Sequence, residues 1–81
     1  MPYIPCEARL DITSGKRSPK SPGELNFVIM DLILNYLFPR GHNYTNFNEV
    51  IGVLESVKQE FYRRMVAPYE DMKKQIEGDV F

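Results

Sequence analysis

Residues 21–38 predict a helix that is apolar on nearly every side. Ser21 and Glu24 have the S-x-x-E spacing of a helix start, where a hydroxyl and a carboxylate satisfy free backbone N–H groups. Pro22 stands at the first helical position, where its missing N–H costs nothing. Pro39 ends the pattern. A helix that is apolar nearly all round has to be buried on more than one side.

One apolar side of this helix is expected to face a second copy of the chain. A chain of 81 residues builds only a small core, so its other elements cannot easily cover both sides. A symmetric dimer is the simplest cover, and a tetramer fits the same pattern. The residues predicted to form this interface lie on one side of the helical wheel: Phe27, Met30, Leu34 and Phe38.

Residues 45–66 predict a second long helix, because apolar residues recur there at three- and four-residue spacing. Pro68 then either kinks that helix or opens a third segment over residues 68–77. Residues 1–20 hold prolines, turn formers and no apolar periodicity, so an irregular segment is expected, with room for one helical turn near its start. The predicted fold is all-α: a single domain over residues 1–81, in which two long antiparallel helices and a shorter C-terminal one are completed by oligomerisation.

The composition excludes several classes of protein. Ten basic and eleven acidic residues give a net charge of −1, without the basic excess of a protein that coats nucleic acid. The longest apolar stretch, residues 27–38, is too short and too polar to cross a bilayer, so no membrane partner is expected. A lone cysteine and a start without signal-peptide features favour a cytoplasmic protein.

Several short motifs resemble those of a family of short, uncharacterised proteins from phages and bacteria. They are MPYI at residues 1–4, GELN at 23–26, EFYRR at 60–64, PYED at 68–71 and GDV at 78–80. The resemblance covers nearly the whole chain and implies a phage or microbial origin. It implies no established activity.

A few polar residues lie where apolar ones are expected. Lys58 falls inside the apolar stripe of the second helix, where it must extend outward or meet a carboxylate such as Glu24, Asp31 or Glu55. A lysine with a lowered pKa in a pocket is the functional alternative. Asn26 lies on the apolar side of its helix, where it either sets the pairing of packed helices or bonds nearby backbone.

Two basic groups are candidates for phosphate contacts, one in the N-terminal loop and one on the second helix. Their residues are Lys16, Arg17, Lys20, Arg63 and Arg64. Arginine beside an aromatic residue suits nucleic acid, although an ion-paired helix surface explains the second group equally well.

The leading hypothesis is a non-enzymatic, oligomeric interaction or accessory protein that needs no cofactor. One alternative is a nucleic-acid-associated protein that uses the two basic groups. The other is a small metal- or nucleotide-dependent enzyme with a carboxylate site at a subunit interface, built from residues such as Glu24, Asp31 and Glu55. No catalytic or metal-binding motif is recognised, so no residue is assigned to such a site.

Overall fold

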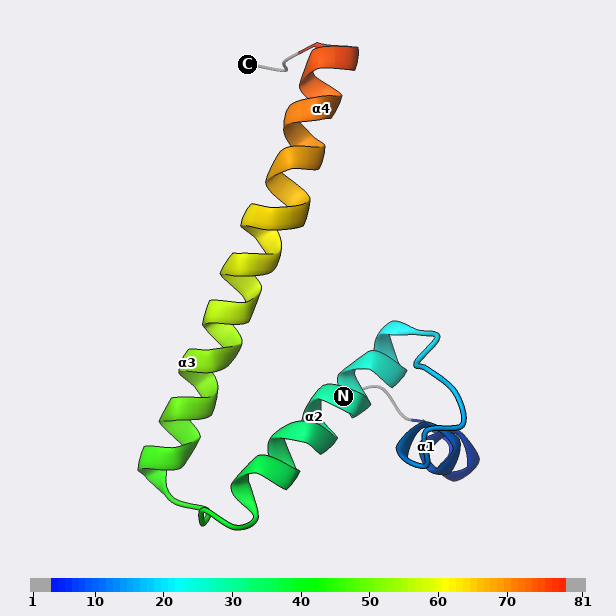
Figure 1. The fold of residues 1–81 in the computed structure, drawn as a ribbon, viewed down its shortest axis with the longest axis vertical. Coiled ribbons are helices and arrows are strands. Elements are labelled where there is room, and N and C mark those ends of the chain that lie inside the picture. Colours follow the sequence, from blue (N-terminus) through cyan, green and yellow to red (C-terminus); the bar gives the residue numbers. More distant parts are fainter. Residues whose placement is uncertain (1–3, 79–81) are drawn as a thin grey trace. The chain divides into compact units, whose positions relative to one another are not determined.

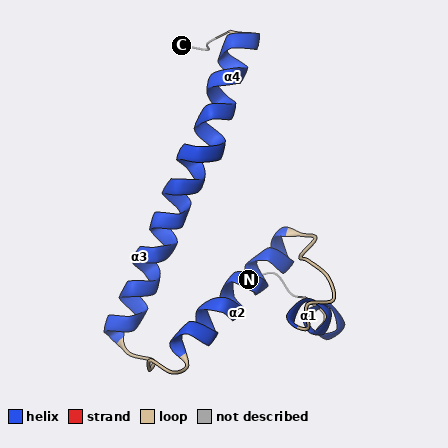
Figure 2. Ribbon diagram, in the orientation of Figure 1, coloured by secondary structure: helices blue, strands red, loops and turns tan. Residues whose placement is uncertain are grey.

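A computed structural model describes residues 4–78, and this part of the chain consists of helices and loops without a strand (Figure 2). The predicted all-helical class is therefore confirmed for the described residues. The chain divides into two compact units, Met1–Asn43 and Tyr44–Phe81. Each unit is described by itself.

The first unit pairs a short helix with a long one. Helix α1 spans Cys6–Thr13 and packs against helix α2, which spans Pro22–Leu37 (Figure 1). The prediction of an irregular segment over residues 1–20 is wrong for α1, which has eight residues instead of one turn. The half-buried side chains of α1 include Ala8 and Ile12, one turn apart. Packing on α2 thus stabilises a helix whose own apolar pattern is weak.

A glycine ends α1. Gly15 has a φ of 80°, a left-handed conformation that side chains with a Cβ rarely adopt. The N–H of Gly15 bonds to the carbonyl of Ile12, and the N–H of Lys16 bonds to the carbonyl of Asp11. This pair of bonds satisfies carbonyls that the helix end would otherwise leave free.

Helix α2 begins where the sequence predicts, with a modified cap. The Ser21 hydroxyl accepts a hydrogen bond of 3.1 Å from the N–H of Glu24. The Glu24 carboxylate accepts from the N–H of Lys20 at 2.9 Å, one residue before the cap. The carboxylate therefore ties the incoming loop to the first turn of the helix.

Exposure around α2 is uneven. Leu37 is buried, and Asn26, Met30 and Ile33 on the same side of the helix are half-buried. A neighbouring side, about 100° around the helix, leaves four large apolar side chains exposed, at the spacing of one helical stripe: Leu25, Ile29, Leu32 and Tyr36. At the helix end, the Arg40 guanidinium lies 3.8 Å from the centre of the Tyr36 ring and donates to the Tyr36 carbonyl.

In the second unit, residues 44–77 form a single continuous helix (Figure 1). Helix α3 spans Tyr44–Phe61, a π-helical turn η1 spans Tyr62–Val66, and helix α4 spans Ala67–Glu77. The N–H of Ala67 bonds to the carbonyl of Tyr62, five residues earlier. Pro68 follows at once; it cannot donate to a carbonyl four residues earlier, and its ring crowds that carbonyl. A wider turn in front of the proline therefore lets the helix continue.

Candidate interaction surface

The most extensive feature of the second unit is a row of exposed apolar side chains along its whole length. We call this row the apolar seam, and it consists of Phe47, Val50, Leu54, Val57, Phe61, Met65, Tyr69, Met72 and Ile76. Val50 is half-buried, and the other eight side chains are 37–70% exposed. Among the described residues of the chain, only Ile4 and Leu37 are buried apolar side chains. A row of this length is typical of a surface that another helix covers.

The seam follows a seven-residue repeat interrupted by one extra residue. Steps of three and four residues alternate from Phe47 to Phe61, the spacing of a coiled-coil core. An unbroken repeat would next reach Arg64, but the seam continues at Met65, one residue later. The extra residue falls inside η1, where a turn one residue wider than an α-turn accommodates it. The π-turn therefore keeps both halves of the seam on one side of the helix.

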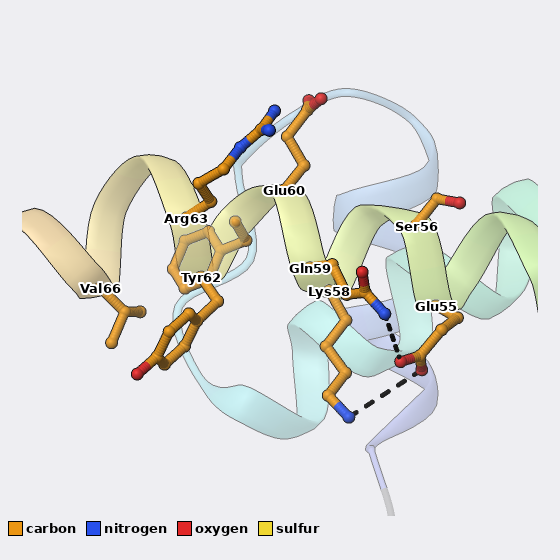
Figure 3. A pocket seen from close by; sticks show the side chains of 9 residues that line it. Glu55, Ser56, Lys58, Gln59, Glu60, Tyr62, Arg63 and Val66 are labelled. Atoms are coloured by element: carbon orange, nitrogen blue, oxygen red, sulfur yellow. Dashed lines mark hydrogen bonds and ion pairs between the residues drawn. The ribbon is translucent and has the colours of Figure 1, made fainter.

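An open hollow with both polar and apolar walls lies beside the junction of α3 and η1 (Figure 3). Its lining residues are Glu55, Ser56, Lys58, Gln59, Glu60, Phe61, Tyr62, Arg63 and Val66. Figure 3 shows the Lys58 and Gln59 side chains directed at Glu55. The Lys58 amine lies 3.9 Å from a Glu55 oxygen, and the Gln59 amide donates to the other oxygen at 3.1 Å. The Lys58 side chain is 77% exposed, so it extends outward and meets a carboxylate on its own helix.

Another polar contact joins the first residue of η1 to helix α4. The Tyr62 hydroxyl donates a hydrogen bond of 2.7 Å to Glu70. This bond to a carboxylate raises the pKa of Tyr62 above its ordinary value, because the neutral hydroxyl is the better partner for a negative charge.

The tightest polar cluster lies in the first unit, between Arg17 and Glu24. The guanidinium nitrogens of Arg17 donate to the two Glu24 oxygens at 2.6 and 3.0 Å. The Arg17 hydrogen bonds, followed by the bond from the Lys20 N–H, lower the pKa of Glu24 from 4.5 to about 2. The same pairing raises the pKa of Arg17. Arg17, a predicted phosphate contact, is thus held by a carboxylate on its own chain.

The other predicted phosphate contacts lie at the surface. The Lys16 amine lies 3.9 Å from Asp11 and is 76% exposed. Lys20 and Arg63 are exposed, and the Arg64 guanidinium lies 3.9 Å from Glu60, one turn earlier. These basic groups therefore stand among carboxylates.

The four residues of the predicted oligomer interface, on α2 and at its end, differ in exposure. Phe27 and Met30 are half-buried, whereas Leu34 is 49% and Phe38 83% exposed. Asp31 is half-buried like Asn26. The predicted interface residues all belong to this helix and its end, so sequence reasoning included none of the seam residues among them. The signal was a seven-residue repeat hidden by one extra residue.

The described residues, 4–78, contain neither a cluster of metal-binding side chains nor a membrane-spanning helix. In this part of the chain no three or more His, Cys, Asp or Glu side chains gather closely enough to hold a metal ion. No helix within it combines the length and apolar character needed to cross a membrane.

Fold and surface together define a small helical protein with an exposed apolar seam. The chain belongs to the family described as a domain of unknown function (DUF6899), whose model matches residues 1–80. This match confirms the predicted membership, over nearly the whole chain, in a family without an established activity. Searches of the curated proteins and of the solved structures gave no match.

Proposed function

We propose that this chain is a non-enzymatic accessory module that works by self-association. The observation that carries the proposal is the apolar seam, which runs the length of the second unit and stays largely exposed. Covering exposed apolar surface is the main driving force for helix association in water. The polar clusters support an interaction role, because Arg17 already holds the Glu24 carboxylate and Lys58 extends along the surface towards Glu55.

We also propose that α2 packs antiparallel on α3, with the exposed stripe of α2 against the first half of the seam. The α2 stripe repeats every three or four residues from Leu25 to Tyr36. The matching part of α3 is wide, because Ile51 and Val53 flank the seam and are 64% and 60% exposed. A wide apolar face has room for two neighbours, one from the same chain and one from another copy.

The test is the absolute mass of the full chain by light scattering on a sizing column. The expected mass is at least twice the 9.5 kDa of one chain. Phe61→Glu puts a charge into the seam and should lower the mass to that of a single chain, because a buried unpaired charge is costly. Ser56→Glu adds the same charge to the same helix away from the seam and should leave the mass unchanged. A parent chain at 9.5 kDa would refute the proposal.

A further inference from the structure

We propose that a second copy of this chain covers the seam by lying antiparallel along the helix from Tyr44 to Glu77, with the two-fold axis at Arg63. This inference rests on the proposed self-association and adds the surface, the direction and the register. It follows from three properties of the described residues: the lengths of the helices, the symmetry of the seam and the width of its two halves.

Within residues 4–78, no other helix is long enough to cover the seam by itself. The helix from Tyr44 to Glu77 is roughly 50 Å long and the 16-residue α2 roughly 24 Å, at 1.5 Å per residue. A short loop joins α2 to Tyr44, so an α2 that folds back ends near residue 60. The four seam residues beyond that point then need a partner from another molecule: Met65, Tyr69, Met72 and Ile76.

The seam has the symmetry that a second copy requires. From Val50 to Ile76 its residues follow in steps of four, three, four, four, four, three and four, which read the same in both directions. Arg63, the second residue of η1, is the midpoint. A two-fold axis there puts each seam residue from Val50 to Ile76 opposite another one, in four kinds of pair: Val50 with Ile76, Leu54 with Met72, Val57 with Tyr69, and Phe61 with Met65. A symmetric dimer needs such a self-complementary surface, whereas an unrelated partner does not.

The position of the π-turn fits the same arrangement. With the axis at Arg63, the π-turns of the two copies cross each other. If the extra residue lay far from the axis, the π-turn of one helix would face a regular turn of the other. The seam residues of the two copies would then no longer lie opposite each other. A parallel pair also aligns the two turns, but it brings the like ends of two helix dipoles together, which an antiparallel pair avoids.

Area and charge suit such a pair. The eight seam residues from Val50 to Ile76 are large apolar side chains, most of them about half exposed, so two facing seams would cover several hundred Å² per partner, on the order of the roughly 800 Å² per partner of a standard stable interface. Beside the seam, Lys58 of one copy comes opposite Val66 and Pro68 of the other, so no like charge opposes it. In this arrangement, the narrow second half of each seam packs on the wide first half of the partner's seam.

Spin-label distances test the direction. In the full chain with Cys6→Ser, a label is attached at Glu49→Cys or, separately, at Ser56→Cys. The two sites are one seven-residue repeat apart and share the same side of the helix, so they differ only in distance from the axis.

In an antiparallel pair the two labels of a dimer lie about 40 Å apart along the helix at position 49 and about 20 Å apart at position 56. The measured distance at position 49 should therefore be greater by on the order of 15 Å, once the shared sideways separation is included. Equal distances at the two sites in a dimer would overturn the inference and leave self-association standing. A labelled chain that is monomeric by light scattering, like its parent, would overturn both.

Discussion

The Tyr62 hydroxyl donates to the Glu70 carboxylate at 2.7 Å, although the two residues are eight positions apart on one helix. In a regular α-helix, residues eight apart differ by about 80° around the axis, whereas residues seven apart lie nearly in line. The π-turn between them absorbs one residue, so Tyr62 and Glu70 behave as if they were seven apart. The same extra residue aligns the two halves of the apolar seam.

Removal of the extra residue should preserve self-association. In a Pro68→Ala background, which removes the need for a wide turn, deletion of Arg63 restores an unbroken seven-residue repeat. Insertion of one alanine after Arg63 in that background rotates the halves of the seam apart by about 100°. Sedimentation equilibrium should find the deletion variant as associated as its background and the insertion variant at least tenfold weaker. The opposite order would contradict the role given to the π-turn.

Loss of the α2 cap should destabilise the fold. Ser21→Ala removes the hydroxyl that accepts from the Glu24 N–H, at a typical cost of about 1 kcal/mol. For a domain of this size, that cost lowers the Tm by about 4–8 °C in a thermal melt. Ser18→Ala, a change in the exposed loop before the helix, is the control and should melt like the parent. Equal melting of the two variants would mean that the cap contributes nothing.

The Arg17–Glu24 pair should make stability depend on pH in the acidic range. The pKa of Glu24 is about 2 in the folded chain against an ordinary value of 4.5, so the folded state favours the ionised carboxylate. Its contribution is complete above pH 4.5 and is lost as the pH falls from 4.5 towards 2. Chemical unfolding of the parent and of Glu24→Gln should therefore differ at pH 7 and converge near pH 2. A difference that stays constant over this range would refute the assignment.

Lys58 should contribute little to stability. Its amine is 3.9 Å from Glu55 and its side chain is 77% exposed, and exposed ion pairs contribute about 0–1 kcal/mol. Lys58→Met keeps the long side chain, so the free energy of unfolding should change by less than about 1 kcal/mol. A loss of several kcal/mol in chemical unfolding would instead indicate a buried partner for the lysine.

The sequence predicts the helices whose signals are local and misses what depends on contacts. Ser21, Pro22 and Glu24 locate the start of α2 because capping needs only neighbouring residues. Helix α1 is missed because its pattern is weak and its stability comes from α2, although Gly15 is a readable end signal.

The polar pairs differ in the same respect, because some join neighbours on one helix and others depend on tertiary structure. Glu55 is one of three partners that the sequence offers Lys58, beside Glu24 and Asp31, and it lies on the same helix. The Arg17–Glu24 pair is not predicted, because it depends on the path of a loop. The sequence does not predict the π-turn. Pro68 indicates only that the regular helical hydrogen bonding is interrupted, and it does not indicate that a wider turn lets the helix continue.

Thermal unfolding followed by circular dichroism at several chain concentrations tests the central claim most directly, namely that a second copy covers the seam. Mass action stabilises a folded state that exists only in an oligomer, so its Tm depends on concentration. We predict that a roughly hundredfold rise in concentration raises the Tm of the helical signal by several degrees. Phe61→Glu should abolish this dependence. A parent chain that keeps its helical signal and the same Tm at every concentration would contradict the claim.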